Sequence, residues 1–369
     1  MSEETMGKTV AGTESQDTST AGAAAAGGLS PAGAVARFGA TSSGWSGGAL
    51  NVVREAALLP VLVLLVIVGT IVSPTFLTVS NLTGIGQQVS SLGLLVIGES
   101  LVLIAGGMDL SLESTYGLAP MVAAWMILPL SDFGNGAQLG PVIGLLILLL
   151  VGAAVGVING LLIVKARLNG FIVTLAMTII LEGLQNGIVK GQTLFNLPPA
   201  FTYLGSAQVG SIPVSLIFAV GAFIVVGLFM RYHKAGRAIH AVGGNIDAAR
   251  AAGISVDRVR LGAFIAAGML AAVGGLMEAG RVSAVTGQQG YGEGIIFPAF
   301  AAAVIGGVSL KGGRGNMLGA ATGVLLLGLV QNILNLGNVS SYWIDAINGT
   351  VILVALVTAR LVGGKATVE

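Results

Sequence analysis

The sequence contains no cysteine and only two histidines, His233 and His240, among its 369 residues. Without cysteine the chain cannot form disulfides, thiolate nucleophiles, cysteine-ligated zinc sites or iron–sulfur clusters. Two histidines offer little for any other metal site. We therefore expect neither a metal centre nor a cofactor.

Charged side chains are also scarce. They make up 9% of the residues, whereas hydrophobic residues make up 54% and there are 58 glycines. A soluble protein needs roughly a quarter of its residues charged to cover its surface. The net charge of +1 gives no indication of a polyanionic partner, and we expect no binding to nucleic acid. The composition predicts a polytopic membrane protein whose remaining surface meets the lipid bilayer or other protein.

Residues 1–54 differ from the rest of the chain. They are rich in Ser, Thr, Ala and Gly and contain no long apolar run. Such a segment cannot bury enough surface to offset the entropy of ordering it, so it is predicted to be a disordered tail. It also lacks the apolar core of a secretory signal. Residues 55–369 form the predicted transmembrane domain.

Apolar segments follow closely after Arg54, and about 20 residues are needed to cross a bilayer as a helix. We predict an all-α protein with about ten such helices. The third and eighth segments are short and interrupted by glycine, so eight or nine full spans remain an alternative. The ten segments are Ala56–Val72, Ile85–Ala105, Tyr116–Leu130, Val142–Val164, Phe171–Val189, Val214–Met230, Leu261–Ala279, Ile295–Leu310, Met317–Leu336 and Trp343–Leu361.

The distribution of basic residues predicts the orientation. With ten spans and a cytoplasmic N-terminus, 15 of the 17 Lys and Arg residues fall on the cytoplasmic side, and only Lys190 and Arg281 fall outside. Cytoplasmic loops carry an excess of Lys and Arg. We therefore expect ten helices with both termini in the cytoplasm.

Motifs for catalysis are missing. The two Gly-Lys pairs, at Gly7-Lys8 and Gly364-Lys365, lack the upstream glycine of a phosphate-binding P-loop. There is no HExxH zinc motif, and residues 55–369 contain no GxSxG nucleophile elbow. The chain is therefore not expected to hydrolyse ATP or to be an enzyme.

The longest predicted cytoplasmic loop covers residues 231–260. Its middle, from Gly243 to Gly253, has the pattern of a short helix in which Asn245 is the N-cap and Gly253 ends the helix. The small residues would let a partner approach closely. An ordinary solvated basic loop is the alternative.

Asp109 lies beside the pair Gly106-Gly107, where a helix must break near one membrane face. It is expected to cap the following helix, to meet substrate hydroxyls, or both. A similar string recurs at Gly306-Gly307-Val308-Ser309-Leu310, which indicates a parallel internal repeat. Broken helices at corresponding places of two halves often line a translocation path.

Polar residues at helical spacing occur inside several spans, where each is costly unless it faces protein or water. They form a pathway or they hold the helices together by hydrogen bonds, and the sequence favours neither. Thr174, Thr178, Glu182 and Gln185 form one stripe, Gln88, Ser91 and Glu99 a second, and Gln331, Asn332 and Asn335 a third. The pathway candidates are Gln88, Glu99, Asp109, Ser111, Thr178, Glu182, Gln185, Gln331 and Asn335.

Four motifs in order resemble one known family. They are the loop Gly243–Gly253, the string Gly106–Ser111, the string Gly306–Leu310 with its glycine-rich tail, and Asn338–Tyr342. Together they resemble the ribose-type permeases, the membrane subunits of bacterial ABC importers for monosaccharides. This family is related more distantly to branched-chain amino-acid and nucleoside permeases. The resemblance covers about residues 55–361, and the sequence departs from the family at Met108 and at Glu113, a second carboxylate near Asp109.

The resemblance implies a multi-pass permease of the bacterial inner membrane that imports a ribose-, xylose- or fructose-like sugar by alternating access. It implies a second permease copy or paralogue, two cytoplasmic ABC ATPase domains that bind the ATP, and an extracytoplasmic sugar-binding protein that meets Lys190–Pro213. Asp247-Ala248-Ala249 and Gly253 are similar to the EAA-x3-G signature of coupling loops, with Asp in place of Glu. The implied coupling residues are Gly236, Gly243, Gly244, Asn245, Asp247, Ala248, Ala249 and Gly253.

Three alternatives are kept. One is an ABC permease for a nucleoside or a branched-chain amino acid. Another is an ion-coupled transporter that works alone and uses Glu99 and Glu182 as proton or sodium sites. The last is a scaffold or membrane anchor, in which the polar stripes only hold the helices together.

Overall fold

The computed structural model describes residues 58–286 and 294–340, together with scattered positions between 342 and 357. The predicted disordered tail, residues 1–54, lies outside the described residues. Most of the tenth predicted span, Trp343–Leu361, lies outside them as well.

The described part is helical except for two pairs of very short strands. Strand β1 (Thr193–Leu194) pairs antiparallel with β4 (Val285–Thr286), and β2 (Gln208–Val209) pairs with β3 (Ile212–Pro213). The helices are α2 (Leu58–Val72), α3 (Val79–Ile104), α4 (Leu112–Ile127), the 3₁₀-helix η1 (Leu130–Asp132), α5 (Pro141–Gly160), the π-helix η2 (Leu161–Lys165), α6 (Gly170–Val189), α7 (Pro199–Ser206), α8 (Val214–Tyr232), α9 (Lys234–Gly244), α10 (Ile246–Ala251), α11 (Val256–Val282), α12 (Ile296–Ile305) and α13 (Met317–Leu336).

The predicted spans correspond well to these helices. The first nine each match one helix of the described residues, and six helices in that part are long and apolar enough to cross a membrane. The two segments expected to be short are α4, with 16 residues, and α12, with 10. The α12 helix ends at Ile305, five residues before the predicted end of its span at Leu310. The pair Gly306-Gly307 stops the helix there.

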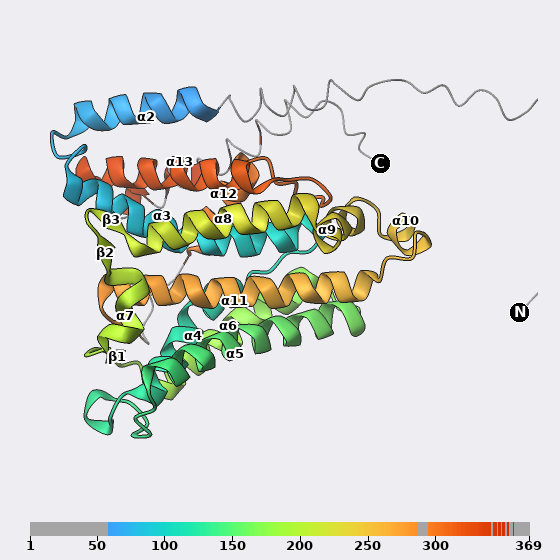
Figure 1. Ribbon diagram of the computed structural model, residues 1–369, viewed down its shortest axis with the longest axis horizontal. Helices are drawn as coiled ribbons and strands as arrows, with labels where there is room; N and C mark the ends of the chain where they lie inside the picture. The colour runs from blue at the N-terminus through green and yellow to red at the C-terminus, as the bar shows by residue number, and fades with distance from the viewer. Residues whose placement is uncertain are drawn as a thin grey trace, which may run out of the picture. The chain divides into compact units, whose positions relative to one another are not determined.

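Helix α3 is the centre of the bundle. It packs against α8, α11, α12 and α13 (Figure 1). Its most apolar stretch is 89% buried, whereas that of α8 is only 17% buried. The outer helices α2, α5, α6 and α8 expose many large apolar side chains, as a surface that meets lipid or a second protein must.

Glycine sets the distance between α5 and α11. A Cβ at Gly152 would overlap the carbonyl oxygen of Gly268, and a Cβ at Gly156 would overlap that of Phe264. Gly152 and Gly156 have the four-residue spacing that lets two membrane helices approach at backbone contact. Helix α5 is thereby held against α11, and its Asn159 reaches the bundle interior.

The functional candidates lie at different levels of the bundle. Helices α9 and α10 lie at one end, next to the end of α3, while α7 and the short strands lie at the other end (Figure 1). The segment that resembles a coupling loop is therefore separated from the segment that resembles the outer loop by the length of the membrane helices.

Candidate functional site

The predicted capped helix in the loop 231–260 is present as α10. The Asn245 side chain accepts a hydrogen bond from the backbone N–H of Ala248 at 2.9 Å. Gly253, with φ +80°, adopts the left-handed conformation that follows many helices. No heavy atom lies within 4 Å of where its Cβ would be, so the backbone conformation, not space, requires glycine there.

Helix α10 has one buried side and one exposed side. Ala249 packs with Val242 and Val256 in a small apolar cluster of its own. Asp247 and Ala248 are exposed, and Asp247 lies 3.6 Å from Arg250 in a solvent-exposed ion pair. Ile246 and Arg250 are exposed as well, so this side of α10 combines small, charged and apolar side chains.

Helix α9 is held to the bundle at both ends by glycine. Near its start, Gly236 is buried, and a Cβ there would overlap the carbonyl oxygen of Phe229. Near its end, a Cβ at Gly243 would overlap the carbonyl oxygen of Ile104 and lie 2.6 Å from the amide nitrogen of Gly313. Gly244, in contrast, is exposed and has space around it.

Gly243 therefore joins three backbone segments. The Gly313 N–H donates to the Ile104 carbonyl at 2.9 Å, and a Cβ at Gly312 would lie 2.9 Å from the Cα of Gly106. We name the contact of Gly106, Gly243, Gly312 and Gly313 the glycine junction. It connects the end of α9 with the loop after α3 and the loop after α12.

These two loops begin in the same way. The N–H groups of Gly106 and Gly107 donate to Leu103 and Val102, each at 2.9 Å. After α12 the N–H groups of Gly307 and Val308 donate to Val304 and Ala303, also at 2.9 Å. Gly106 (φ +75°) and Gly307 (φ +88°) are both left-handed. The similar strings in the sequence thus end α3 and α12 with the same hydrogen-bond pattern.

Asp109 and Ser111 are wholly buried and belong to one polar cluster with Asn159. One Asp109 carboxylate oxygen accepts from the Ser111 backbone N–H at 3.0 Å and from its hydroxyl at 2.7 Å. The Asn159 amide donates to the Ser111 hydroxyl at 2.6 Å. Burial raises the pKa of the Asp109 carboxyl to about 6, and the hydrogen bonds from Ser111 and Asn159 oppose that rise only in part.

The expectation that Asp109 caps the following helix needs correction. Ser111 occupies the N-cap position of α4, and the Asp109 carboxylate bonds Ser111 itself, not the first-turn amides. Asp109 therefore fixes the loop that enters the helix. Being wholly buried, it is closed to a substrate in this conformation.

Two further carboxylates have different surroundings. Glu99 is wholly buried on α3, and neither of its oxygens has a hydrogen-bond partner among the described residues. It lies close enough to Asp109 for the two groups to interact electrostatically. Glu113, expected beside Asp109, instead accepts hydrogen bonds from the backbone N–H groups of Gly294 at 2.9 Å and Ile296 at 3.2 Å. It therefore supports the start of α12.

The stripe on α6 is only partly internal. Thr174 and Gln185 are buried and Thr178 is half-buried, but Glu182 is exposed. Glu182 lies about 80° around the helix from Thr174, enough to turn it out of the bundle. Gln185 donates to the carbonyl of Thr286 at 2.9 Å, which ties α6 to β4.

The amides of the third stripe, on α13, and Gln88 of the second stripe differ in their contacts and in their exposure. Asn332 and Asn81 exchange two amide hydrogen bonds, at 2.8 and 3.0 Å, and so hold α13 against α3. Gln88 and Gln331 are half-buried, and Asn335 is exposed.

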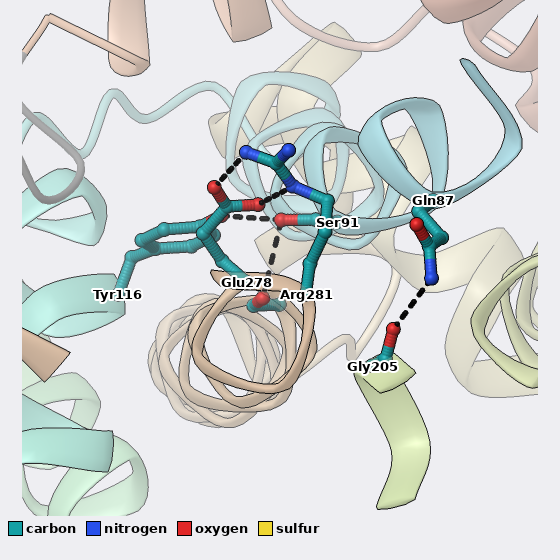
Figure 2. Close-up of polar contacts among 7 residues, drawn as sticks. Gln87, Ser91, Tyr116, Gly205, Glu278 and Arg281 are labelled. Atoms are coloured by element: carbon teal, nitrogen blue, oxygen red, sulfur yellow. Dashed lines mark hydrogen bonds and ion pairs between the residues drawn. The ribbon is translucent and has the colours of Figure 1, made fainter. Parts of the chain in front are cut away.

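Several polar contacts between the helices were not predicted from the sequence. Figure 2 shows the Ser91 hydroxyl bonded to the hydroxyl of Tyr116; it also donates to the Gly274 carbonyl at 3.2 Å. In the same view the Gln87 amide donates to the Gly205 carbonyl at 3.0 Å.

An ion pair lies beside these contacts. Arg281 and Glu278 form an ion pair (Figure 2), and the Glu278 side chain is only 18% exposed. Glu278 lies near a helix end, where a side chain is easily solvated. The sequence therefore gives no signal that Glu278 is mostly buried. The burial of Asn159, in contrast, has a signal in the sequence, because Asn159 is the only amide in the fourth predicted span.

Comparison with known proteins identifies the family. The family model described as "Branched-chain amino acid transport system / permease component" matches residues 81–356. The chain belongs to this permease family. Its members are multi-pass membrane components of bacterial ABC importers; they are not enzymes and carry no cofactor.

The permease also has curated relatives that match over most of their length. It is 33% identical to the ribose import permease protein RbsC of Escherichia coli K12 over 308 residues, covering 82% of this chain and 92% of that protein. It is 36% identical to RbsC of Bacillus subtilis over 301 residues, 81% of this chain and 90% of that one. The galactose/methyl galactoside import permease protein MglC of Haemophilus influenzae is 32% identical over 307 residues, 80% and 91% of the two chains. No solved structure gives a significant match.

The glycine junction makes a specific prediction. Gly243→Ala places a methyl group on the Ile104 carbonyl and the Gly313 amide, so the hydrogen bond between them must break or lengthen. Overpacking of this kind costs about 1–3 kcal/mol, and about 1.4 kcal/mol is a tenfold change in an equilibrium. Amide exchange in residues 309–315 of the purified permease should therefore quicken by about one order of magnitude or more.

Gly244→Ala is the matched control, because its Cβ would have space and Ala favours the helix. Equal exchange rates in the two variants would show that the junction does not hold the loop after α12.

Proposed function

We propose that the permease is the membrane subunit of a carbohydrate importer and that its substrate is a monosaccharide. The observation that carries this proposal is the similarity, over at least 80% of the chain, to permeases named for ribose and for galactose or methyl galactoside. A relative named for L-arabinose matches over 84% of the chain as well. An importer of branched-chain amino acids is the second candidate, favoured by the description of the family model.

The proposed assembly contains two permease subunits, identical or paralogous, two ATPase domains and an extracytoplasmic binding protein. We place both termini and the α9–α10 segment in the cytoplasm, because that orientation puts 15 of the 17 basic residues inside. The permease would then present α7 and the short strands to the binding protein.

The first test of this proposal is purification of the full chain from its native membrane in a mild detergent. We expect ATPase subunits in a stoichiometric ratio and a binding protein whose ligand, measured by calorimetry, is a monosaccharide. Recovery of a binding protein specific for an amino acid or nucleoside would contradict the sugar assignment. Recovery of the chain alone, with uptake driven by an ion gradient, would contradict the importer itself.

Coupling to ATP hydrolysis is proposed to enter through α10. Its exposed side chains are available for docking, and Ala249 on the opposite side anchors it to α9 and α11. A displacement of α9 reaches Gly243 and, through the glycine junction, the loops after α3 and α12 together. ATP bound to the partner favours one arrangement of these elements over the other, which gives the transport cycle its direction.

Two substitutions in α10 test the coupling. Asp247→Arg reverses the charge of the exposed surface, and Gly253→Val places a β-branched residue in a left-handed conformation that costs about 1–2 kcal/mol. Both should abolish stimulation of the ATPase by loaded binding protein in proteoliposomes while the permease still assembles in the membrane.

The controls retain the chemistry of each position. Asp247→Glu keeps the carboxylate, and Gly253→Asn tolerates the left-handed conformation. Normal stimulation in the Arg and Val variants, or its loss in the control variants, would assign docking to another surface.

We propose three roles for the pathway candidates, based on their contacts and exposure. Asp109 and Ser111 bond each other and Asn159, and Thr178 and Gln185 bond other backbone groups, so we propose that they support the bundle. Glu99 is closed off in the same interior. Gln88 and Gln331, half-buried on α3 and α13, are proposed to contact the sugar together with Asn335, because amides both donate to and accept from hydroxyls. Glu182 faces outward and is assigned to the surface that meets lipid or the second permease subunit.

Gln88 offers a direct test of the pathway. Gln88→Ala removes one hydrogen-bonding group, worth about 0.5–1.5 kcal/mol, and should raise the KM for sugar uptake about three- to tenfold. Asn332→Ala is the contrasting variant: it breaks the amide pair with Asn81 and should lower the melting temperature without changing KM. An unchanged KM in Gln88→Ala would place the pathway elsewhere.

A further inference from the structure

A basic cavity of about 690 Å³ lies beside the coupling segment. It is formed by the π-helix η2, the loop that leads into α6, the helix α10 and the first turns of α11. Its charged lining residues are Lys165, Arg167, Arg250, Asp257 and Arg260. The feature is separate from the pathway candidates and from the glycine junction.

The cavity carries an excess of positive charge. Four cationic side chains and one carboxylate line it, a difference of +3. Asp257 pairs with Lys165 at 3.0 Å, and Arg250 lies 3.6 Å from Asp247, which is outside the lining. Within the described residues, neither Arg167 nor Arg260 forms an ion pair.

Arg260 gives the second observation. It is half-buried, and its Nε is shielded from solvent without a hydrogen-bond partner among the described residues. A guanidinium N–H removed from water without an acceptor costs free energy that an anionic ligand would recover. The cavity thus holds a donor that the described part of the chain does not satisfy.

The backbone on the α5 side of the cavity is also unusual. Helix α5 ends in a π-helical turn, and Arg167 has φ +56°, a conformation that side-chain-bearing residues rarely adopt. Both irregularities are typical of functional sites. Here they bring Lys165 and Arg167 to the same cavity.

We propose that this cavity binds the phosphate group of an anionic phospholipid. Arginine matches phosphate through paired N–H donors, and basic pockets at the cytoplasmic ends of membrane helices suit lipid headgroups. The cavity lies at the ends of the apolar helices α5, α6 and α11. The exposed side chain of Leu168 lines it, and the exposed Leu161 and Ile172 are close to lining residues in the sequence. They give acyl chains a surface that a free phosphate would not use.

A bound lipid would act on the coupling segment directly. The cavity wall combines Arg250 of α10 with Arg167 before α6 and Arg260 of α11. One headgroup phosphate contacting these residues would hold α10 to the membrane helices. The proposal goes beyond sugar import and does not depend on which sugar is carried.

The test uses the purified full-length chain, native mass spectrometry and two lipids with the same acyl chains, phosphatidylglycerol and phosphatidylcholine. We expect one phosphatidylglycerol to bind saturably and more tightly than phosphatidylcholine. Arg167→Gln and Arg260→Gln should each weaken phosphatidylglycerol binding about tenfold, since each loses a charge-assisted hydrogen bond. Arg167 is exposed, so its variant should fold even if the half-buried Arg260 proves necessary for stability.

Arg258→Gln is the matched control, because Arg258 is exposed two residues from Arg260 and does not line the cavity. Equal binding of both lipids, or equal weakening in Arg258→Gln, would overturn the proposal. Displacement of the lipid by inorganic phosphate at similar concentration would assign the cavity to a soluble phosphate. Loss of the lipid when the chain is purified with its ATPase would instead assign the cavity to docking of the ATPase. No transport is measured, so these outcomes do not depend on the importer assignment.

Discussion

Contact between backbones without intervening side chains is the constraint on which this structure depends. At the glycine junction the Gly313 amide bonds the Ile104 carbonyl, and Gly243 packs on both, so neither loop has room to shift past the other. The same kind of contact holds α5 to α11 at Gly152 and Gly268. In a membrane, where lipid competes well for apolar surface, such approach supplies packing energy that larger side chains would not. The high glycine content is therefore a source of rigidity here.

The interior polar groups differ in their hydrogen bonds and in their exposure. Asp109, Ser111 and Asn159 satisfy one another and fix the entry to α4. Glu99, beside them, has no hydrogen-bond partner within the described residues, an arrangement that is costly in a bundle interior. The half-buried amides on α3 and α13 have a different character, because they are accessible in part and uncharged. On the proposed function, these uncharged amides line the sugar pathway, and the buried carboxylates belong to the supporting structure of the bundle.

The sequence predicts the helices and the capped α10 because both depend on local signals: long apolar runs, an Asn before a helix and a Gly after it. It also indicates the matching ends of α3 and α12, since each follows from a glycine pair. It cannot predict contacts between distant segments, such as Tyr116 with Ser91 or Gly243 with Gly313, which depend on helix packing. Spacing alone cannot predict the exposure of Glu182, because a residue about 80° around the helix from the buried Thr174 lies at the border between the inner and outer faces of α6.

The enclosure of α3 limits how the permease can move. A helix that is packed on most sides cannot slide or tilt without carrying its neighbours, whereas α8, largely uncovered, can. Relative motion of helices is therefore easier at the periphery of the subunit than at α3. The glycine junction lies at one end of α3, so the loops that meet there are attached to the most enclosed of the long apolar helices in the described part.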